Sequence, residues 1–105
     1  AQIDAMMALI HDDHLDCLRS KAEYLEIVPA GTGKADAMQV LCDRLGIDAG
    51  QTMAMGDHDI DCGLLRAAAV GIAMGNASPA AKQAARCVTG SNDQAGVAQA
   101  IYQWI

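Results

Sequence analysis

Apolar residues in the first half of the chain recur with two different periods. Over residues 1–19 they fall near helical spacing, with His and Asp between them, which predicts a helix. The run Tyr24–Val28 predicts a short strand that ends at Pro29. From Lys34 to Leu45 the apolar residues return to one helical face, and Gly46 predicts the end of that helix.

The second half of the chain alternates between short apolar runs and helical segments. Apolar runs without polar alternation are typical of strands that are buried on both faces. Three such strands, Thr52–Met55, Val70–Met74 and Arg86–Thr89, alternate with three helices, Asp61–Ala68, Ser78–Ala85 and Gly96–Trp104. This order predicts an α/β fold, a Rossmann-like parallel sheet with helices on both faces and three layers in all. No internal repeat or linker interrupts the pattern.

Composition narrows the classes of function. The 105 residues are 52% hydrophobic and 19% charged, which excludes a disordered acidic tail and is enough for one modest core. The net charge of −6 argues against nucleic-acid and anionic-membrane partners. No apolar run approaches the ~20 residues of a membrane span, and no signal peptide is evident. The four dispersed cysteines are therefore expected to be reduced thiols in a cytoplasmic protein.

Polar residues follow two of the predicted strands, at the edge where such sheets bind ligands. Asp57, Asp59 and Asp61 come within five residues after one strand, and Asn76 follows the next. Clustered carboxylates repel one another unless a cation neutralises them, and hard oxygen ligands suit Mg²⁺ or Ca²⁺. A solvated acidic loop that caps the next helix is the alternative. A calcium EF-hand is excluded, because Ala68 stands where that loop needs its bidentate acid.

Two further candidates come from predicted helices. Lys34 follows Gly-Thr-Gly and opens a helix, so it could place a cation at an anion site, with a solvated lysine as the alternative. His11, His14 and Cys17 lie near helical spacing, and the two histidines could hold a soft metal, with a solvated polar face as the alternative. The sequence carries no phosphate-loop pattern and no GxSxG or HExxH arrangement.

Two stretches of the chain resemble the haloacid dehalogenase superfamily, specifically the C-terminal part of its Cof-type sugar-phosphate phosphatases. They read YLEIVPAGTGKADAMQVLCDRLGI and TMAMGDHDIDCGLLRAAAVGIAMGNASPAAKQAARCVTGSNDQAGVAQAI. The resemblance runs from about Tyr24 to Trp104 and rests on motifs in matching order and spacing. It implies that residues 24–105 form the C-terminal half of the family's core, and that residues 1–23 are a remnant helix of a cap domain.

In that family a magnesium ion and an aspartate nucleophile handle a phosphomonoester. The resemblance implies that Asp57 is a direct magnesium ligand and that Asp61 supports the metal through water or neighbouring contacts. Asp59 and Asn76 are possible accessory positions. Lys34 would neutralise the phosphoryl group and the nucleophile. The implied function is that of the C-terminal portion of a magnesium-dependent phosphohydrolase that acts on small phosphomonoesters such as sugar phosphates.

The chain departs from the family pattern in ways that bear on activity. The DxDGT-type motif that supplies the nucleophile is absent, so the chain alone is expected to be inactive. Ile60 stands where the family has Asn, and Ala35 and Ala69 stand where it usually has Gly. The edge of the strand near Thr52–Met55 is expected to be exposed and to pair with another copy in a homo-oligomer. The alternative function is a non-catalytic, self-associating α/β module with residual metal or phosphate affinity.

Overall fold

The N-terminal part of the computed structural model is a short helix followed by a hairpin. The structure describes residues 2–10, 12–21 and 24–105. Helix α1 (Gln2–Leu9) precedes strands β1 (Leu15–Lys21) and β2 (Tyr24–Pro29), which pair antiparallel. The predicted helix over residues 1–19 is therefore wrong beyond Leu9. The backbone N–H of His14 donates to the Asp12 carboxylate at 2.8 Å in a turn, and the following residues form a ladder with β2 in place of helical hydrogen bonds.

The remainder of the chain alternates helices and strands, as the sequence predicts. The long helix α2 spans Lys34–Leu45 and ends at Gly46, which takes the left-handed φ of 66° that terminates a helix. The later elements are η1 (Ala49–Gln51), β3 (Met53–Gly56), η2 (Asp59–Asp61), α3 (Cys62–Ala67), β4 (Val70–Ala73), α4 (Pro79–Ala84), β5 (Cys87–Val88), η3 (Asn92–Gln94) and α5 (Gly96–Trp104). Two elements differ from their predicted bounds. Strand β5 has only two residues, and a 3₁₀ turn precedes α3.

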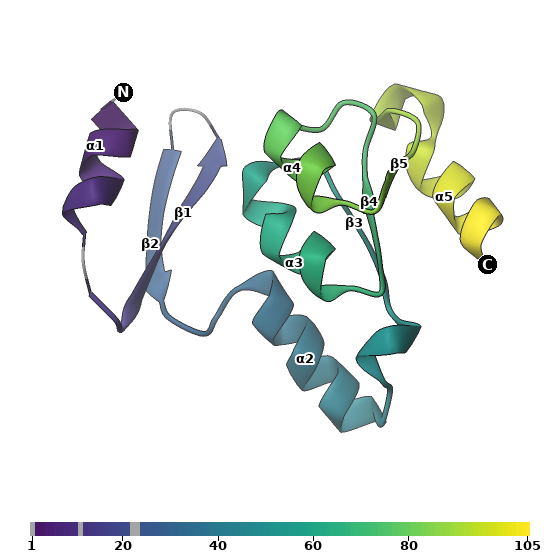
Figure 1. The fold of residues 1–105 in the computed structure, drawn as a ribbon, viewed down its shortest axis with the longest axis horizontal. Coiled ribbons are helices and arrows are strands. Elements are labelled where there is room, and N and C mark those ends of the chain that lie inside the picture. Colours follow the sequence, from purple (N-terminus) through teal and green to yellow (C-terminus); the bar gives the residue numbers. More distant parts are fainter. Residues whose placement is uncertain (1, 11, 22–23) are drawn as a thin grey trace.

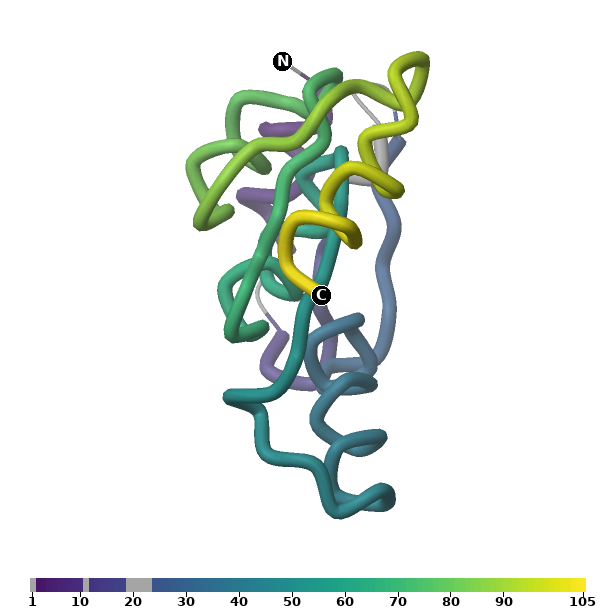
Figure 2. Tube along the Cα trace, turned by 90° about the vertical axis from the view of Figure 1, so that its right-hand side faces the viewer, coloured from purple at the N-terminus to yellow at the C-terminus, as the bar shows by residue number. Residues whose placement is uncertain are grey.

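Strands β3, β4 and β5 form one parallel sheet in that order. Figure 1 shows α3 and α4 in front of this sheet, and Figure 2 shows α5 on the side turned away from them. A Cβ on Gly71 of β4 would collide with the Leu65 carbonyl of α3, so the two backbones approach closely on that face. Leu65 and Ile72 are the largest fully buried side chains. The α/β fold with a helix-covered parallel sheet is thus confirmed.

Strand β2 pairs with β1 and not with the parallel sheet. The hairpin and α1 stand beside the sheet and its helices in Figure 1, connected to them through α2. The predicted division of the chain into residues 1–23 and 24–105 stays a prediction. None of the helices in the described ranges has the length and apolar character needed to cross a membrane.

One edge of β3 is open. Thr52 accepts a hydrogen bond from Val70 at 3.1 Å, and Gly56 accepts one from Met74 at 2.9 Å, so these carbonyls face β4. Because backbone groups alternate sides along a strand, those of Met53 and Met55 face away from β4. In the described part of the chain, no strand pairs with that side of β3.

Candidate active site

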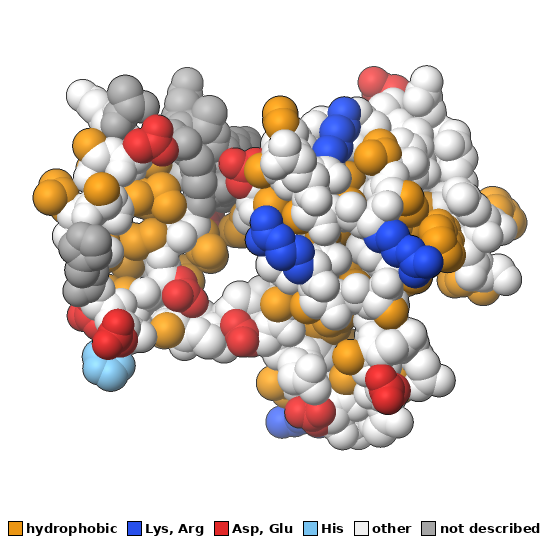
Figure 3. Space-filling view, in the orientation of Figure 1, with side chains coloured by type: hydrophobic (Ala, Val, Ile, Leu, Met, Phe, Trp, Pro, Cys, Tyr) orange, Lys and Arg blue, Asp and Glu red, His pale blue; other side chains and the backbone are white. Residues whose placement is uncertain are grey.

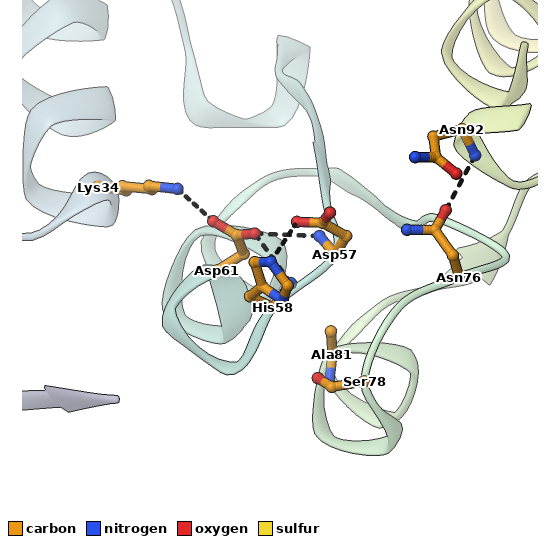
Figure 4. Close-up of polar contacts among 8 residues, drawn as sticks. All are labelled: Lys34, Asp57, His58, Asp61, Asn76, Ser78, Ala81 and Asn92. Atoms are coloured by element: carbon orange, nitrogen blue, oxygen red, sulfur yellow. Dashed lines mark hydrogen bonds and ion pairs between the residues drawn. The ribbon is translucent and has the colours of Figure 1, made fainter. Parts of the chain in front are cut away.

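The candidate site lies where the carboxyl end of β3 meets the first turn of α2. Gly33 is the N-cap of α2 and Lys34 is its first residue, so the lysine projects from the start of the helix. Its Nζ donates a hydrogen bond to Oδ1 of Asp61, which lies 27 residues further along the chain (Figure 4). The fold therefore brings together the lysine and one of the carboxylates that the sequence singled out.

Asp61 closes the loop that follows β3. Its side chain is only 6% exposed, and its Oδ2 accepts from the backbone N–H of Asp57 at 3.0 Å and of His58 at 3.2 Å. Burial works to raise the pKa of Asp61, but the Lys34 ammonium and the two N–H donors outweigh it, so the pKa is lowered from its ordinary value. The carboxylate is ionised, and both of its oxygens are engaged within the protein.

Asp57 holds a different position. Its backbone carbonyl accepts from the N–H of Ser78 at 2.9 Å, which ties the loop to the start of α4. Its side chain remains 41% exposed, and Nε2 of the exposed His58 lies 3.9 Å from its Oδ1. The Asp57 carboxylate is therefore open to an external ligand, while hydrogen bonds hold both its backbone N–H and its backbone C=O.

The donor set fits a magnesium ion that draws most of its ligands from elsewhere. Within residues 2–10, 12–21 and 24–105, no group of three or more His, Cys, Asp or Glu side chains could hold a metal. Magnesium, however, is commonly held through one or two carboxylates, with waters and substrate phosphate completing an octahedron. Asp57 supplies one open carboxylate of this kind. Asp61, with both oxygens engaged, orients the loop and does not offer itself as a second direct ligand.

The two accessory positions, Asp59 and Asn76, have different surroundings. Asp59 is exposed in η2, on the wall of a cavity that also includes Lys34. The Asn76 side chain points toward Asn92 in Figure 4, and its Oδ1 accepts from the backbone N–H of Asn92 at 2.9 Å. This bond joins the loop after β4 to η3, so Asn76 has a structural contact of its own. Their roles at a metal or phosphate stay predictions.

The proposed cluster of His11, His14 and Cys17 does not form on one helix. His14 lies in the turn before β1 and Cys17 lies within β1, so helical spacing no longer relates them. His11 lies outside the described residues. The Asp12 side chain, which accepts from the His14 backbone, begins the turn that ends the helical prediction there.

Sequence reasoning missed two features of the site. One is the pair of backbone N–H groups at positions 57 and 58, which anchor Asp61 and which side-chain motifs do not reveal. The other is Ile60, which appears in the sequence only as a departure from the family pattern but lies on the cavity wall beside Lys34. Two signals in the sequence point to these backbone N–H groups: a tight turn directly after a strand, and the four-residue spacing of Asp57 and Asp61.

Comparison with known proteins agrees with this geometry. A family model described as haloacid dehalogenase-like hydrolase matches residues 1–101. A phosphoglycolate phosphatase of Pyrobaculum neutrophilum is 46% identical over 82 residues, which is 78% of this chain and 36% of that protein. The chloroplastic endoribonuclease YBEY of Arabidopsis thaliana is 37% identical over 92 residues, 88% of this chain but only 16% of that protein.

The structural comparison points the same way. A haloacid dehalogenase-like hydrolase from B. subtilis superimposes with a TM-score of 0.94 at 31% identity, covering 99% of this chain and 37% of that one. The chain thus spans little more than a third of these phosphatase and hydrolase relatives, and less of the endoribonuclease.

Proposed function

Because the chain belongs to the haloacid dehalogenase-like hydrolases, we propose that it is part of a magnesium-dependent phosphohydrolase acting on small phosphomonoesters such as sugar phosphates. The observation that carries the proposal is the Lys34–Asp61 ion pair beside the open carboxylate of Asp57, at the carboxyl end of a parallel strand. In open α/β sheets, ligands bind at that edge. The name of the phosphatase relative supports the reaction class.

Each side chain has a distinct role in this proposal. Lys34 is 54% exposed, so its ammonium can donate to Asp61 and still reach a phosphoryl oxygen. Asp61 holds that ammonium and fixes the backbone of the loop after β3. Asp57 would hold magnesium, which when bound neutralises the charge on the phosphoryl oxygens. Phosphoryl transfer depends mainly on this positioning and charge neutralisation, which these residues are arranged to supply.

The attacking carboxylate has no counterpart in this chain. The 105 residues contain no DxDGT-type motif, and a covalent mechanism that lacks its nucleophile is abolished, not merely slowed. We therefore expect the 105-residue chain to show no turnover by itself. Incubation with magnesium and 4-nitrophenyl phosphate tests this. Turnover that disappears in Asp57→Ala would show that the chain carries a complete active site after all.

Magnesium titration by isothermal calorimetry tests the metal site directly. With one open carboxylate, we expect weak binding, at best in the millimolar range. Asp57→Asn removes the negative ligand and should weaken binding about tenfold or more. The matched control is Asp93→Asn, an exposed aspartate in η3, which should leave binding unchanged. Equal affinity of the wild type and Asp57→Asn would contradict the assignment.

A second candidate function is a non-catalytic module that self-associates. The specific observation in its favour is the open side of β3, where the backbone groups of Met53 and Met55 face no strand of the described chain. Retained magnesium or phosphate affinity without turnover, together with a stable oligomer, would favour this function over an enzyme fragment. The oligomeric state therefore discriminates between the two functions.

A further inference from the structure

The loop between β4 and α4, residues 74–78, packs backbone to backbone against the segment that follows β5. A Cβ on Gly75 would lie 2.9 Å from the backbone nitrogen of Ser91, closer than a side chain can approach. The N–H of Gly75 donates to the carbonyl of Gly90 at 3.1 Å. Glycine at position 75 therefore lets the two segments meet without a side chain between them.

Asn76 adds a side-chain hydrogen bond to this contact. Its Oδ1 accepts from the backbone N–H of Asn92, the first residue of η3, at 2.9 Å (Figure 4). The two residues are 16 positions apart, so the bond joins separate parts of the chain. Residues 62–92 contain no acidic side chain, so no ion pair within this part of the chain assists the contact. Hydrogen bonds therefore hold the loop to η3.

The other end of the loop reaches Asp57, the open carboxylate of the candidate site. Ser78 is the N-cap of α4, where its Oγ accepts from the backbone N–H of Ala81 at 3.3 Å. The backbone N–H of Ser78 donates to the carbonyl of Asp57 at 2.9 Å. The N–H of Asp57 donates to Asp61 at 3.0 Å. The backbone of Asp57 is thus held by Asp61 through its N–H and by the loop after β4 through its carbonyl.

The loop lies outside the cavity that adjoins Lys34. This cavity, of about 480 Å³, lies between the N-terminal part and the rest of the chain, where Figure 3 shows a hollow. None of residues 74–92, all of which the structure describes, lines it. The Oδ1 of Asn76 is already engaged by η3. An effect of Asn76 on the site is therefore expected to pass through the backbone that it holds.

From these contacts, we propose that Asn76 is a positioning residue that holds Asp57 in place for magnesium and acts through Ser78. The inference rests on the proposed function, because it concerns the metal that Asp57 would hold. Magnesium demands nearly ideal octahedral geometry, so a carboxylate on a fixed backbone binds it better than one on a loop that opens often. The bond between Asn76 and Asn92 keeps the loop closed, and the closed loop offers its Ser78 N–H to the carbonyl of Asp57.

Two substitutions remove the bond from opposite sides. Asn76→Ala removes the acceptor, and Asn92→Pro removes the donating N–H while Asn76 stays intact. Proline fits at position 92, because this residue begins a 3₁₀ turn and Ser91 before it is extended, with φ −71° and ψ 170°. Asn92→Ala is the matched control, since it keeps the backbone N–H. In the metal-free, ¹⁵N-labelled chain, hydrogen exchange of the Ser78 amide should be about fivefold faster in the first two variants and unchanged in the control.

Magnesium affinity separates a positioning role from a merely structural one. In titrations followed at the Asp57 and His58 amides, Asn76→Ala and Asn92→Pro should each raise the Kd for magnesium about threefold, and Asn92→Ala should not. The double variant Asn76→Ala/Asn92→Pro should bind no more weakly than either single variant, because both remove the same hydrogen bond.

Thr52→Val controls for a general loss of stability. The Thr52 hydroxyl donates to the carbonyl of Ala49 at 2.6 Å and accepts from the N–H of Ala69 at 3.1 Å, at the end of β3 away from Asp57. Valine has the same shape but makes neither bond, so the variant should be less stable to urea. Its Kd for magnesium should equal that of the wild type.

The outcomes distinguish this inference from the proposed function. If the wild type binds magnesium, then wild-type affinity or unchanged Ser78 exchange in Asn76→Ala and Asn92→Pro would overturn the positioning role alone. An equal loss of affinity in Asn92→Ala or Thr52→Val would do the same. A wild-type chain whose Asp57 and His58 amides do not respond to magnesium would reject the metal site of the proposed function, and the positioning role with it.

Discussion

Among single residues, Asp61 is buried and charged, and its carboxylate accepts hydrogen bonds from three donors. Asparagine has the same size but only one acceptor oxygen, so Asp61→Asn cannot serve both Lys34 and the two backbone N–H groups. We expect the free energy of unfolding to fall by about 2 kcal/mol, the scale of a charge-assisted hydrogen bond. Urea denaturation at neutral pH measures it. Asp59→Asn, on the same turn but exposed, is the control and should change stability by less than about 0.5 kcal/mol.

The lowered pKa of Asp61 predicts a dependence of stability on pH. Burial opposes the shift, but Lys34 and the two N–H donors keep the folded-state pKa below the unfolded value of about 3.9. As the pH falls, Asp61 is therefore protonated in the unfolded chain before it is protonated in the folded chain. The stabilisation that Asp61 provides is complete above the unfolded-state pKa and is lost as the pH falls through the folded-state pKa. Urea denaturation of wild type and Asp61→Asn in metal-free buffer should show curves that converge below about pH 4. A constant difference down to acid pH would contradict the assignment.

The residue types at the site were readable from the sequence, but their division of labour was not. Lys34 opens a helix and Asp57 follows a strand, and both positions follow from local patterns. That Asp61 uses both oxygens inside the protein depends on the path of the backbone at residues 57 and 58. Ile60 lines a cavity because the hairpin lies opposite it, and no local sequence pattern predicts where the hairpin lies.

At the level of elements, Gly56 connects the end of β3 to the site. A Cβ at this position would lie 2.5 Å from the Cβ of Asp61 and 2.8 Å from its Oδ2. Gly56→Ala should therefore displace the buried carboxylate from Lys34 and lower the free energy of unfolding by about 1–3 kcal/mol, without removing any charged group.

The matched control for that substitution is Gly63→Ala in helix α3. A Cβ there meets only the Cβ of Ala35 at 4.0 Å, which is ordinary contact. Replacing glycine by alanine inside a helix should raise stability by up to about 1 kcal/mol. Urea denaturation of the two variants should thus give changes of opposite sign. A loss of stability in Gly63→Ala as large as in Gly56→Ala would show that the effect is not specific to the site.

Elements were predictable where one pattern dominates. Helix α2 begins at Lys34 and ends before Gly46 as expected, because its apolar face and its terminating glycine agree. The helix predicted over residues 1–19 extends too far because Leu15 and Leu18 continue a helical spacing. In the structure, Leu15 pairs with Pro29 and Leu18 with Glu26 in the hairpin. Pairing between strands is a tertiary effect, and it overrides a short periodic signal.

For the whole molecule, the parallel sheet is asymmetric. Strand β4 has a neighbour on each side and its residues Gly71 to Ala73 are buried, whereas β3 has a neighbour on one side only. An open edge of this kind is a template for another strand. The alternation of strands with helices predicts the order of the strands. Within the described chain β3 has no neighbour on its other side, and only the family resemblance predicts this.

We propose that a second copy of this chain pairs with the open side of β3. The outward-facing N–H and C=O groups of Met53 and Met55 are self-complementary, because an antiparallel copy related by a twofold axis offers the same groups in reverse order. Wild-type protein should therefore sediment as a dimer at submillimolar concentration. Met53→Pro removes one outward N–H at the first residue of the strand, where proline is tolerated, and should shift the protein to monomer, whereas Met53→Ala should remain dimeric. A wild-type chain that stays monomeric throughout, or a Met53→Pro variant that dimerises as well as Met53→Ala, would contradict pairing at this edge and would also remove the observation that favours a self-associating module.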